Sequence, residues 1–284
     1  MDSNQTPTPA SLTRRRFLKL ALGGAAATSV LGLTYATLEA GWIETTTASI
    51  RIPKLPPAFA GLRVAFLSDI HHGPFTGISY LQAIVARTQA LAPDLILLGG
   101  DYVHHASQYI KPCFETLSAL TAPLGVYGVL GNHDHYHGAA ATRAAMQRAG
   151  IVELDNVGVW IEKSAQRFRL AGVGDLWEDD QDLDAALGDV APADACILLS
   201  HNPDYAESIN DSRPGLVLSG HTHGGQVVFP LIGPPIVPSR YGQKYAHGLV
   251  AAPTTQVFVS RGLGTITPPV RFCCRPEINL LTLS

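Results

Sequence analysis

Two histidines one residue apart, His221 and His223, follow a short apolar run that stops at Gly220. Neutral imidazole is a common ligand for transition metals. Residues i and i+2 of an extended strand point the same way. We therefore expect both imidazoles to face one point in space, where a single segment could reach two neighbouring metal ions. The same spacing also occurs in ordinary turns, so the motif gains weight only from other segments that end in the same way.

Four earlier apolar segments end in comparable side chains. In chain order the candidate ligands are Asp69, His71, Asp101, Asn132, His133, His201, His221 and His223. These are oxygen and imidazole donors without thiolate, a set suited to Mn, Fe or Zn. Five segments of this kind are too many for coincidence. The pattern therefore predicts a metal site built from several strand ends.

The elements that would carry these residues follow an α/β pattern. Buried strands are predicted at 62–68, 94–98 and 125–130, with helices at 78–91, 107–120 and 138–149. The second half is richer in strands, predicted at 157–161, 168–173, 195–199, 216–218, 226–229, 257–260 and 278–283, and 226–229 is expected to pair back with 216–218. Functional groups gather at the carboxyl ends of the strands in open α/β sheets. This is where the candidate ligands fall.

Composition indicates a globular protein without a nucleic-acid partner. Apolar residues make up 46% of the chain and charged residues 15%, and the net charge is −3. The four cysteines have no zinc-site spacing. Cys196 is expected to be a buried core thiol, and the disulfide status of the others stays open.

The N-terminus has the pattern of a targeting segment. Residues 13–19 read Thr-Arg-Arg-Arg-Phe-Leu-Lys, which matches the twin-arginine export pattern, and an uncharged run follows from Leu20 to Leu38. We expect residues 1–40 to be a twin-arginine signal or a membrane anchor, and 41–284 to be one catalytic domain. The twin-arginine export machinery is then a partner, membrane association is expected, and the location is the periplasm or cell envelope. Whether the signal is cleaved stays open.

The ligand motifs resemble those of the calcineurin-like metallophosphoesterases. The resemblance is carried by Asp69-x-His71, Gly100-Asp101, Gly131-Asn132-His133-Asp134, His201 and Gly220-His221-x-His223. With the twin-arginine pattern, the chain resembles the exported YkuE/YaeI-type branch. The resemblance implies a four-layer α/β/β/α sandwich with two mixed β-sheets.

The resemblance also implies two divalent metal ions (Mn, Fe or Zn) and hydrolysis by a hydroxide that bridges them. One metal would be bound by Asp69, His71, Asp101 and His223, and the other by Asp101, Asn132, His201 and His221. His133 would donate a proton or hydrogen bond during the reaction. Asp134 would orient the His133 imidazole, with a simple helix cap as the alternative role.

The substrate is less well defined by the sequence. An apolar, proline-rich loop at 229–238 follows the last ligands and could meet a membrane or an acyl chain. Arg240 and Arg261 are candidate phosphate contacts. We expect a phosphodiester, pyrophosphate or phosphomonoester, with a lipid-linked or envelope substrate favoured. The alternatives are a metal-binding scaffold without turnover and a dimetal hydrolase of a non-phosphate ester.

Overall fold

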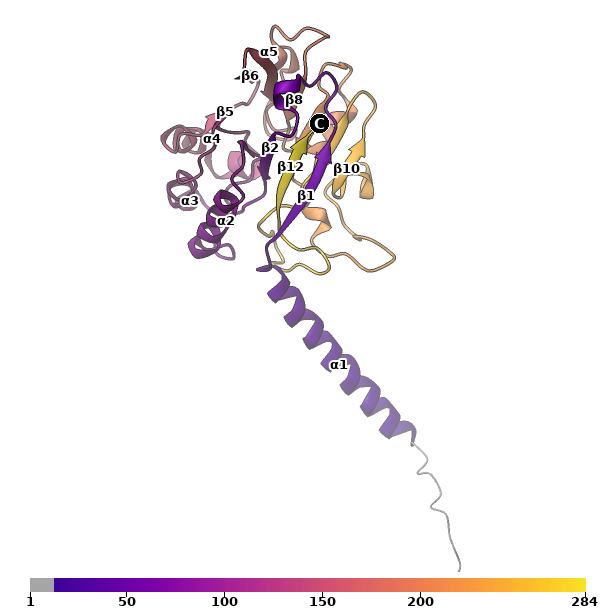
Figure 1. Cartoon of the computed structure of the whole chain (residues 1–284). Coiled ribbons are helices and arrows are strands. Elements are labelled where there is room, and N and C mark those ends of the chain that lie inside the picture. Colours follow the sequence, from indigo (N-terminus) through magenta and orange to yellow (C-terminus); the bar gives the residue numbers. More distant parts are fainter. Residues whose placement is uncertain (1–12) are drawn as a thin grey trace, which may run out of the picture.

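Two six-stranded β-sheets form the centre of the fold in the computed structural model, which describes residues 13–284 (Figure 1). The first sheet has the order β1 (Glu44–Ile50), β12 (Glu277–Leu283), β2 (Arg63–Leu67), β3 (Leu95–Leu98), β4 (Val126–Gly128), β5 (Val152–Glu153). The second has the order β10 (Gly248–Ala251), β11 (Gln256–Val259), β9 (Leu216–Ser219), β8 (Cys196–Leu199), β7 (Gln166–Gly172), β6 (Val157–Lys163). Both sheets are mixed: the first has one antiparallel pairing, between β12 and β2, and the second has one at each edge, between β10 and β11 and between β6 and β7.

Helices complete four layers. The first sheet is covered by α2 (Ile78–Ala90), α3 (Ile110–Leu117) and α4 (Asn132–Arg148), and the second by the short α5 (Leu183–Leu187) with 3₁₀ turns. Alternate residues of a strand face opposite sides of its sheet. In β3, Ile96 packs toward the helices and Leu97 toward the second sheet. The predicted α/β/β/α sandwich is confirmed, although its second helical layer is thin.

The strands that precede the candidate ligands end at one edge of the two sheets. Their following loops are joined by backbone hydrogen bonds: Asp69 N–H donates to Gly100 O at 3.0 Å, and Gly220 N–H donates to His201 O at 3.0 Å. Leu67 is in register with Leu98 in β2 and β3. The parallel register therefore brings residues far apart in sequence to one place.

The predicted strands differ from the observed ones in two places. Residues 226–229 do not form a strand against 216–218, because Val227 bridges to Phe272 and Phe229 to Gly233. The short strands β5 and β10 were not predicted, since neither has a distinctive apolar pattern. The strands predicted at 157–161 and 168–173 are confirmed as β6 and β7, which pair with each other antiparallel. Cys196 is fully buried as expected, and all four cysteines are free.

A long apolar helix, α1 (Arg14–Glu39), projects from the domain (Figure 1). Within residues 13–284 it is the one helix long and apolar enough to cross a membrane. Its last turn is not free, because Ala36 and Glu39 are buried against the domain. The first twelve residues of the predicted signal lie outside the described part of the chain.

Candidate metal centre

Two groups of buried side chains at the strand ends could each hold a metal ion. The first consists of Asp69, His71 and His223, and the second of Asp101, His201 and His221. Within each group the possible ligand atoms lie within 4.8 Å of one another. The structure thus brings together the residues that the sequence motifs predicted.

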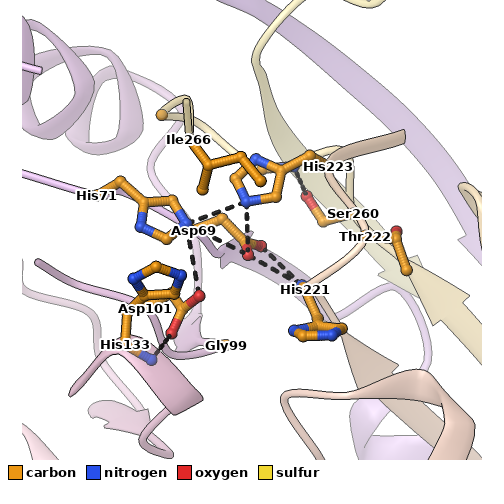
Figure 2. A network of polar contacts seen from close by, with 12 residues as sticks. Asp69, His71, Gly99, Asp101, His133, His221, Thr222, His223, Ser260 and Ile266 are labelled. Atoms are coloured by element: carbon orange, nitrogen blue, oxygen red, sulfur yellow. Dashed lines mark hydrogen bonds and ion pairs between the residues drawn. The ribbon is translucent and has the colours of Figure 1, made fainter. Parts of the chain in front are cut away.

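Asp101 lies between the two groups. Its Oδ2 is 3.4 Å from His71 Nε2 (Figure 2) and 3.3 Å from His201 Nε2. On the first side, His71 Nε2 is 3.0 Å from His223 Nε2, which is 3.4 Å from Asp69 Oδ1. A single carboxylate oxygen is therefore positioned to contact both centres.

The second group is completed by an amide oxygen. His221 Nδ1 lies 3.1 Å from Asn132 Oδ1 and 3.3 Å from His201 Nε2. His201 Nδ1–H donates to Gly99 O at 2.7 Å. This hydrogen bond fixes the tautomer of His201 and leaves Nε2 free to act as a ligand.

The backbone aims several of these side chains by an unusual conformation. The φ angles of Asp69, His71, Asp101, His221 and His223 are +53°, +49°, +56°, +68° and +53°. The left-handed region is disfavoured for these residues and is concentrated at functional sites. The prediction that His221 and His223 lie in an extended strand is therefore wrong. β9 ends at Ser219, and the chain turns tightly so that the two imidazoles reach different groups.

Two glycines make this close packing feasible. A Cβ on Gly220 would overlap Ser68 Oγ and Asp69 Oδ2, and a Cβ on Gly131 would overlap Asp101 Oδ1. The glycines of the ligand motifs thus let the backbone of one loop touch the ligands of another.

The charges of the site fit divalent cations. Asp69 and Asp101 are buried, and within residues 13–284 neither forms an ion pair with a lysine or arginine. Burial raises the pKa of Asp69 to about 6. Burial also lowers the pKa of His221 to about 3 and that of His223 well below its ordinary value, so both imidazoles are neutral and have a lone pair to donate.

His133 has a partner that sequence reasoning missed. His133 Nδ1 lies 3.0 Å from His104 Nδ1, and His105 stacks on His104 with ring centroids 4.3 Å apart. The sequence signal that could have identified His104 is its place three residues after Asp101, on a strand-end loop.

The carboxylate of Asp134 contacts backbone N–H groups. Its Oδ2 accepts from the backbone N–H groups of Asp101 and Gly131, and its Oδ1 accepts from that of Tyr102. Its carboxylate therefore ties two ligand loops together, and the imidazole of His133 pairs with His104 instead. The alternative role as a helix cap is the one that the structure shows.

The two arginines predicted to bind substrate differ in their surroundings. Arg261 is part-buried and forms ion pairs with Glu277 and Glu44. Those carboxylates engage its guanidinium, and its contact with substrate stays a prediction. Arg240 is exposed, and its backbone N–H donates to Asp204 at 2.7 Å. Its contact with substrate stays a prediction.

An aromatic residue at the site was also missed. The Trp177 ring lies edge-on to His221 with centroids 4.3 Å apart, and it is 46% exposed. Asp175 is buried and accepts from the N–H groups of Trp177 and Glu178. This turn places Trp177 as an exposed wall of the second group.

Comparison with known proteins agrees with this geometry. The family model for calcineurin-like phosphoesterases matches residues 62–225, which include every candidate ligand. The chain belongs to this family. The family implies a hydrolase that uses metal ions to cleave a phosphoester bond.

Curated relatives cover nearly the whole chain. It is 33% identical over 280 residues to "Uncharacterized metallophosphoesterase YkuE" of Bacillus subtilis, covering 96% of this chain and 98% of that protein. It is 33% identical over 276 residues to "Phosphodiesterase YaeI" of Escherichia coli, covering 96% and 99%. Among solved structures, the NAD nucleotidase of Haemophilus influenzae is similar, with a TM-score of 0.45 and 15% identity over 70% of this chain and 49% of that one.

Proposed function

We propose that the chain is a dinuclear metal-dependent phosphodiesterase or pyrophosphatase. Asp69, His71 and His223 would hold one metal ion. His201, His221 and Asn132 would hold the other, with Asp101 shared between them. The single observation that carries this proposal is the place of Asp101 Oδ2, within 3.4 Å of an imidazole nitrogen of each group.

The chain supplies the ligand geometry for this chemistry. When bound, two divalent cations polarise a phosphoryl oxygen and provide hydroxide near neutral pH. Asp69 and Asp101 offset the positive charge of the cations. The neutral imidazoles of His71, His221 and His223 offer a nitrogen lone pair to a cation. The hydrogen bond from His201 to Gly99 O limits rotation of the His201 ring.

His133 would donate a proton to the leaving-group oxygen. Its Nδ1 is engaged by His104, so Nε2 is the ring nitrogen left for the substrate. His104 thereby positions the His133 ring, a role that the sequence interpretation had given to Asp134. General acids contribute about 10²- to 10⁴-fold to rate.

The test uses the full chain loaded with Mn, Fe or Zn, and compares bis-p-nitrophenyl phosphate with p-nitrophenyl phosphate. The Asp101→Asn variant should lose metal and turnover together. The His133→Ala variant should keep both metals and lose about 10²-fold or more in kcat. His247→Ala is the matched control, because His247 is exposed and lies outside the cluster. Two bound metals without hydrolysis of either phosphate ester would contradict the proposal and favour a scaffold; hydrolysis of a carboxylic ester alone would favour a non-phosphate hydrolase.

For the substrate we propose a lipid-linked or other cell-envelope phosphodiester or pyrophosphate. A cavity of about 290 Å³ lies near the backbone of the loop that carries Asp69, and its walls include Phe75, Tyr80 and Pro269. It is also lined by Gly264, whose N–H donates to Asp69 O at 2.6 Å. The apolar walls suit an alkyl chain attached to the phosphate.

This substrate class can be tested separately from catalysis. A Phe75→Asp variant should raise KM for a long-chain diester and leave KM for the soluble diester unchanged. Phe75 is 54% exposed, so the change does not disturb the core. Equal effects on both substrates would contradict the lipid assignment while leaving the phosphodiesterase proposal intact.

We also propose that the chain is exported by the twin-arginine machinery to the periplasm or cell envelope. The support is the Thr13–Lys19 pattern directly before the apolar part of α1. Replacing Arg14 and Arg15 together by lysine should retain the protein in the cytoplasm, as measured by fractionation. Unchanged export would contradict the proposal.

A further inference from the structure

The C-terminal turn of α1, called its foot below, packs into the domain. The carboxylate of Glu39 is fully buried and accepts from the backbone N–H groups of Cys273 and Cys274 at 3.0 and 2.7 Å. The Arg271 N–H donates to Ala36 O at 2.9 Å. The helix is thus joined to the domain by specific hydrogen bonds, and removal of the segment up to Ala36 would break one of them.

Aromatic side chains continue from this junction to the apolar loop. Tyr35 lies edge-on to both Trp42 and Phe272, with centroids 5.7 and 5.6 Å apart. Phe272 in turn lies 6.2 Å from Phe229, where the apolar loop begins. The loop therefore lies at the same end of the domain as the foot of α1.

The loop is unusually exposed for its composition. The relative exposure of Leu231 is 107%, that of Ile232 is 72% and that of Ile236 is 76%. The segment from Phe229 to Pro238 carries no charge. Large apolar side chains grouped in this way indicate an interaction surface.

The length and composition of α1 indicate where the membrane surface would lie relative to the domain. Its 26 residues are roughly 39 Å long at 1.5 Å per residue, enough for a hydrocarbon core of about 30 Å. The uncharged run ends at Leu38, so Tyr35 and Trp42 fall near the interface, where aromatic side chains are enriched. Arg275 lies 5.4 Å from the Trp42 ring, which suits the charged headgroup layer.

We propose that α1 is retained as an anchor and that the loop from Phe229 to Pro238 inserts into the same lipid bilayer. This loop is called the membrane loop below. The bilayer is the occupant because the loop is continuous, through Phe272 and Tyr35, with a helix that is itself long enough to span. With both α1 and the membrane loop in the bilayer, the orientation of the domain is fixed. With α1 alone, the domain could rotate relative to the membrane. This inference does not depend on the proposed function.

The orientation also affects the metal centre. The membrane loop begins six residues after His223, and the Sγ of Cys274, whose N–H is bound by Glu39, contacts His223 O at 3.3 Å. Both membrane contacts thus adjoin the segment that carries a candidate ligand. The site is held close to the bilayer surface.

The experiment places an environment-sensitive fluorophore on single cysteines in the full chain. The background is Cys273→Ser, because Cys113, Cys196 and Cys274 are buried. The loop positions are Ile232→Cys and Ile236→Cys. The protein is reconstituted into phosphatidylethanolamine and phosphatidylglycerol vesicles, with and without brominated acyl chains.

Two further positions serve as controls. Thr28→Cys, in the middle of α1, reports that the helix is inserted. Ala251→Cys is a matched exposed apolar site at the end of β10, where Ala251 pairs with Gln256 at the start of β11, away from the strand ends that carry the candidate ligands.

Brominated lipid should quench the labels at 28, 232 and 236, and the emission of these labels should shift to the blue. The label at 251 should show neither effect. If the label at 28 is quenched while those at 232 and 236 behave like the one at 251, α1 is the sole membrane contact and the proposal is overturned. Isolation from cells of a mature protein that lacks the residues up to Ala36 would also overturn the proposal, because α1 would then not be retained.

Discussion

The buried carboxylate of Asp69 gives a sharp test of how the metal centre affects stability. Its pKa is raised by burial from 3.8 to about 6. Because the pKa of Asp69 is higher in the folded than in the unfolded protein, protonation of this carboxyl favours folding. This contribution to stability is fully present below pH 3.8 and is lost as the pH rises through 6. A difference of about 2 pH units corresponds to about 3 kcal/mol. The metal-free protein should therefore carry this cost at pH 8.

The Asp69→Asn variant removes the charge and keeps a carbonyl oxygen for the His221 N–H, which Asp69 accepts at 2.9 Å. Without metal, the variant should be about 3 kcal/mol more stable than the parent at pH 8, and this advantage should shrink as pH falls to 5. With metal at a hundredfold excess over Kd, the parent gains about 2.7 kcal/mol per site, and the variant loses that gain at one site.

The assay is urea unfolding of both proteins in the same detergent, with and without chelator, at pH 5 and pH 8. Elemental analysis gives the metal content of each sample. The expected result is that adding metal cancels or reverses the order of stability at pH 8. A metal-free Asp69→Asn variant less stable than the parent at pH 8 would refute the argument that burial of this charge is costly.

Three further outcomes are expected. Because burial lowers the pKa of His71 and His223, metal should be retained after dialysis at pH 6, where free imidazole is mostly protonated; release near pH 6.5 would contradict this. Gly220→Ala should lose metal through overlap with Ser68, whereas Gly77→Ala, with open space at its Cβ, should keep it; equal metal content would argue against the steric role. Asp134→Asn should lower the free energy of unfolding by about 1–3 kcal/mol, because one buried N–H loses its acceptor; loss of turnover at unchanged stability would instead favour direct action on His133.

The sequence by itself determined the class of fold and the list of metal-ligand candidates. The buried strands that lead to Asp69, Asp101 and His201 can be recognised from neighbouring residues alone. The apolar pattern of a strand and the type of residue that follows it are local properties of the sequence. The family motifs added the expectation of two sheets and two metals. The family match supports these expectations, and the donor groups are consistent with them.

Only the tertiary structure decided how side chains from different segments pair. Asp134 binds backbone N–H groups of Asp101 and Tyr102, more than 30 positions earlier in the chain, and His104 takes the place beside His133. Arg261, which follows β11 of the second sheet, pairs with Glu44 at the start of β1 in the first sheet. Such contacts depend on strand order and register, which no local pattern specifies.

The backbone at the ligands is the clearest case. The sequence placed His221 and His223 one residue apart, and an extended strand was the simplest local geometry. The structure instead gives both residues positive φ, a conformation that local propensity disfavours. Packing of Gly220 against Ser68 and hydrogen bonds to Asp69 hold this turn in place. The local sequence identifies the candidate ligands, and contacts between distant loops determine where each side chain points.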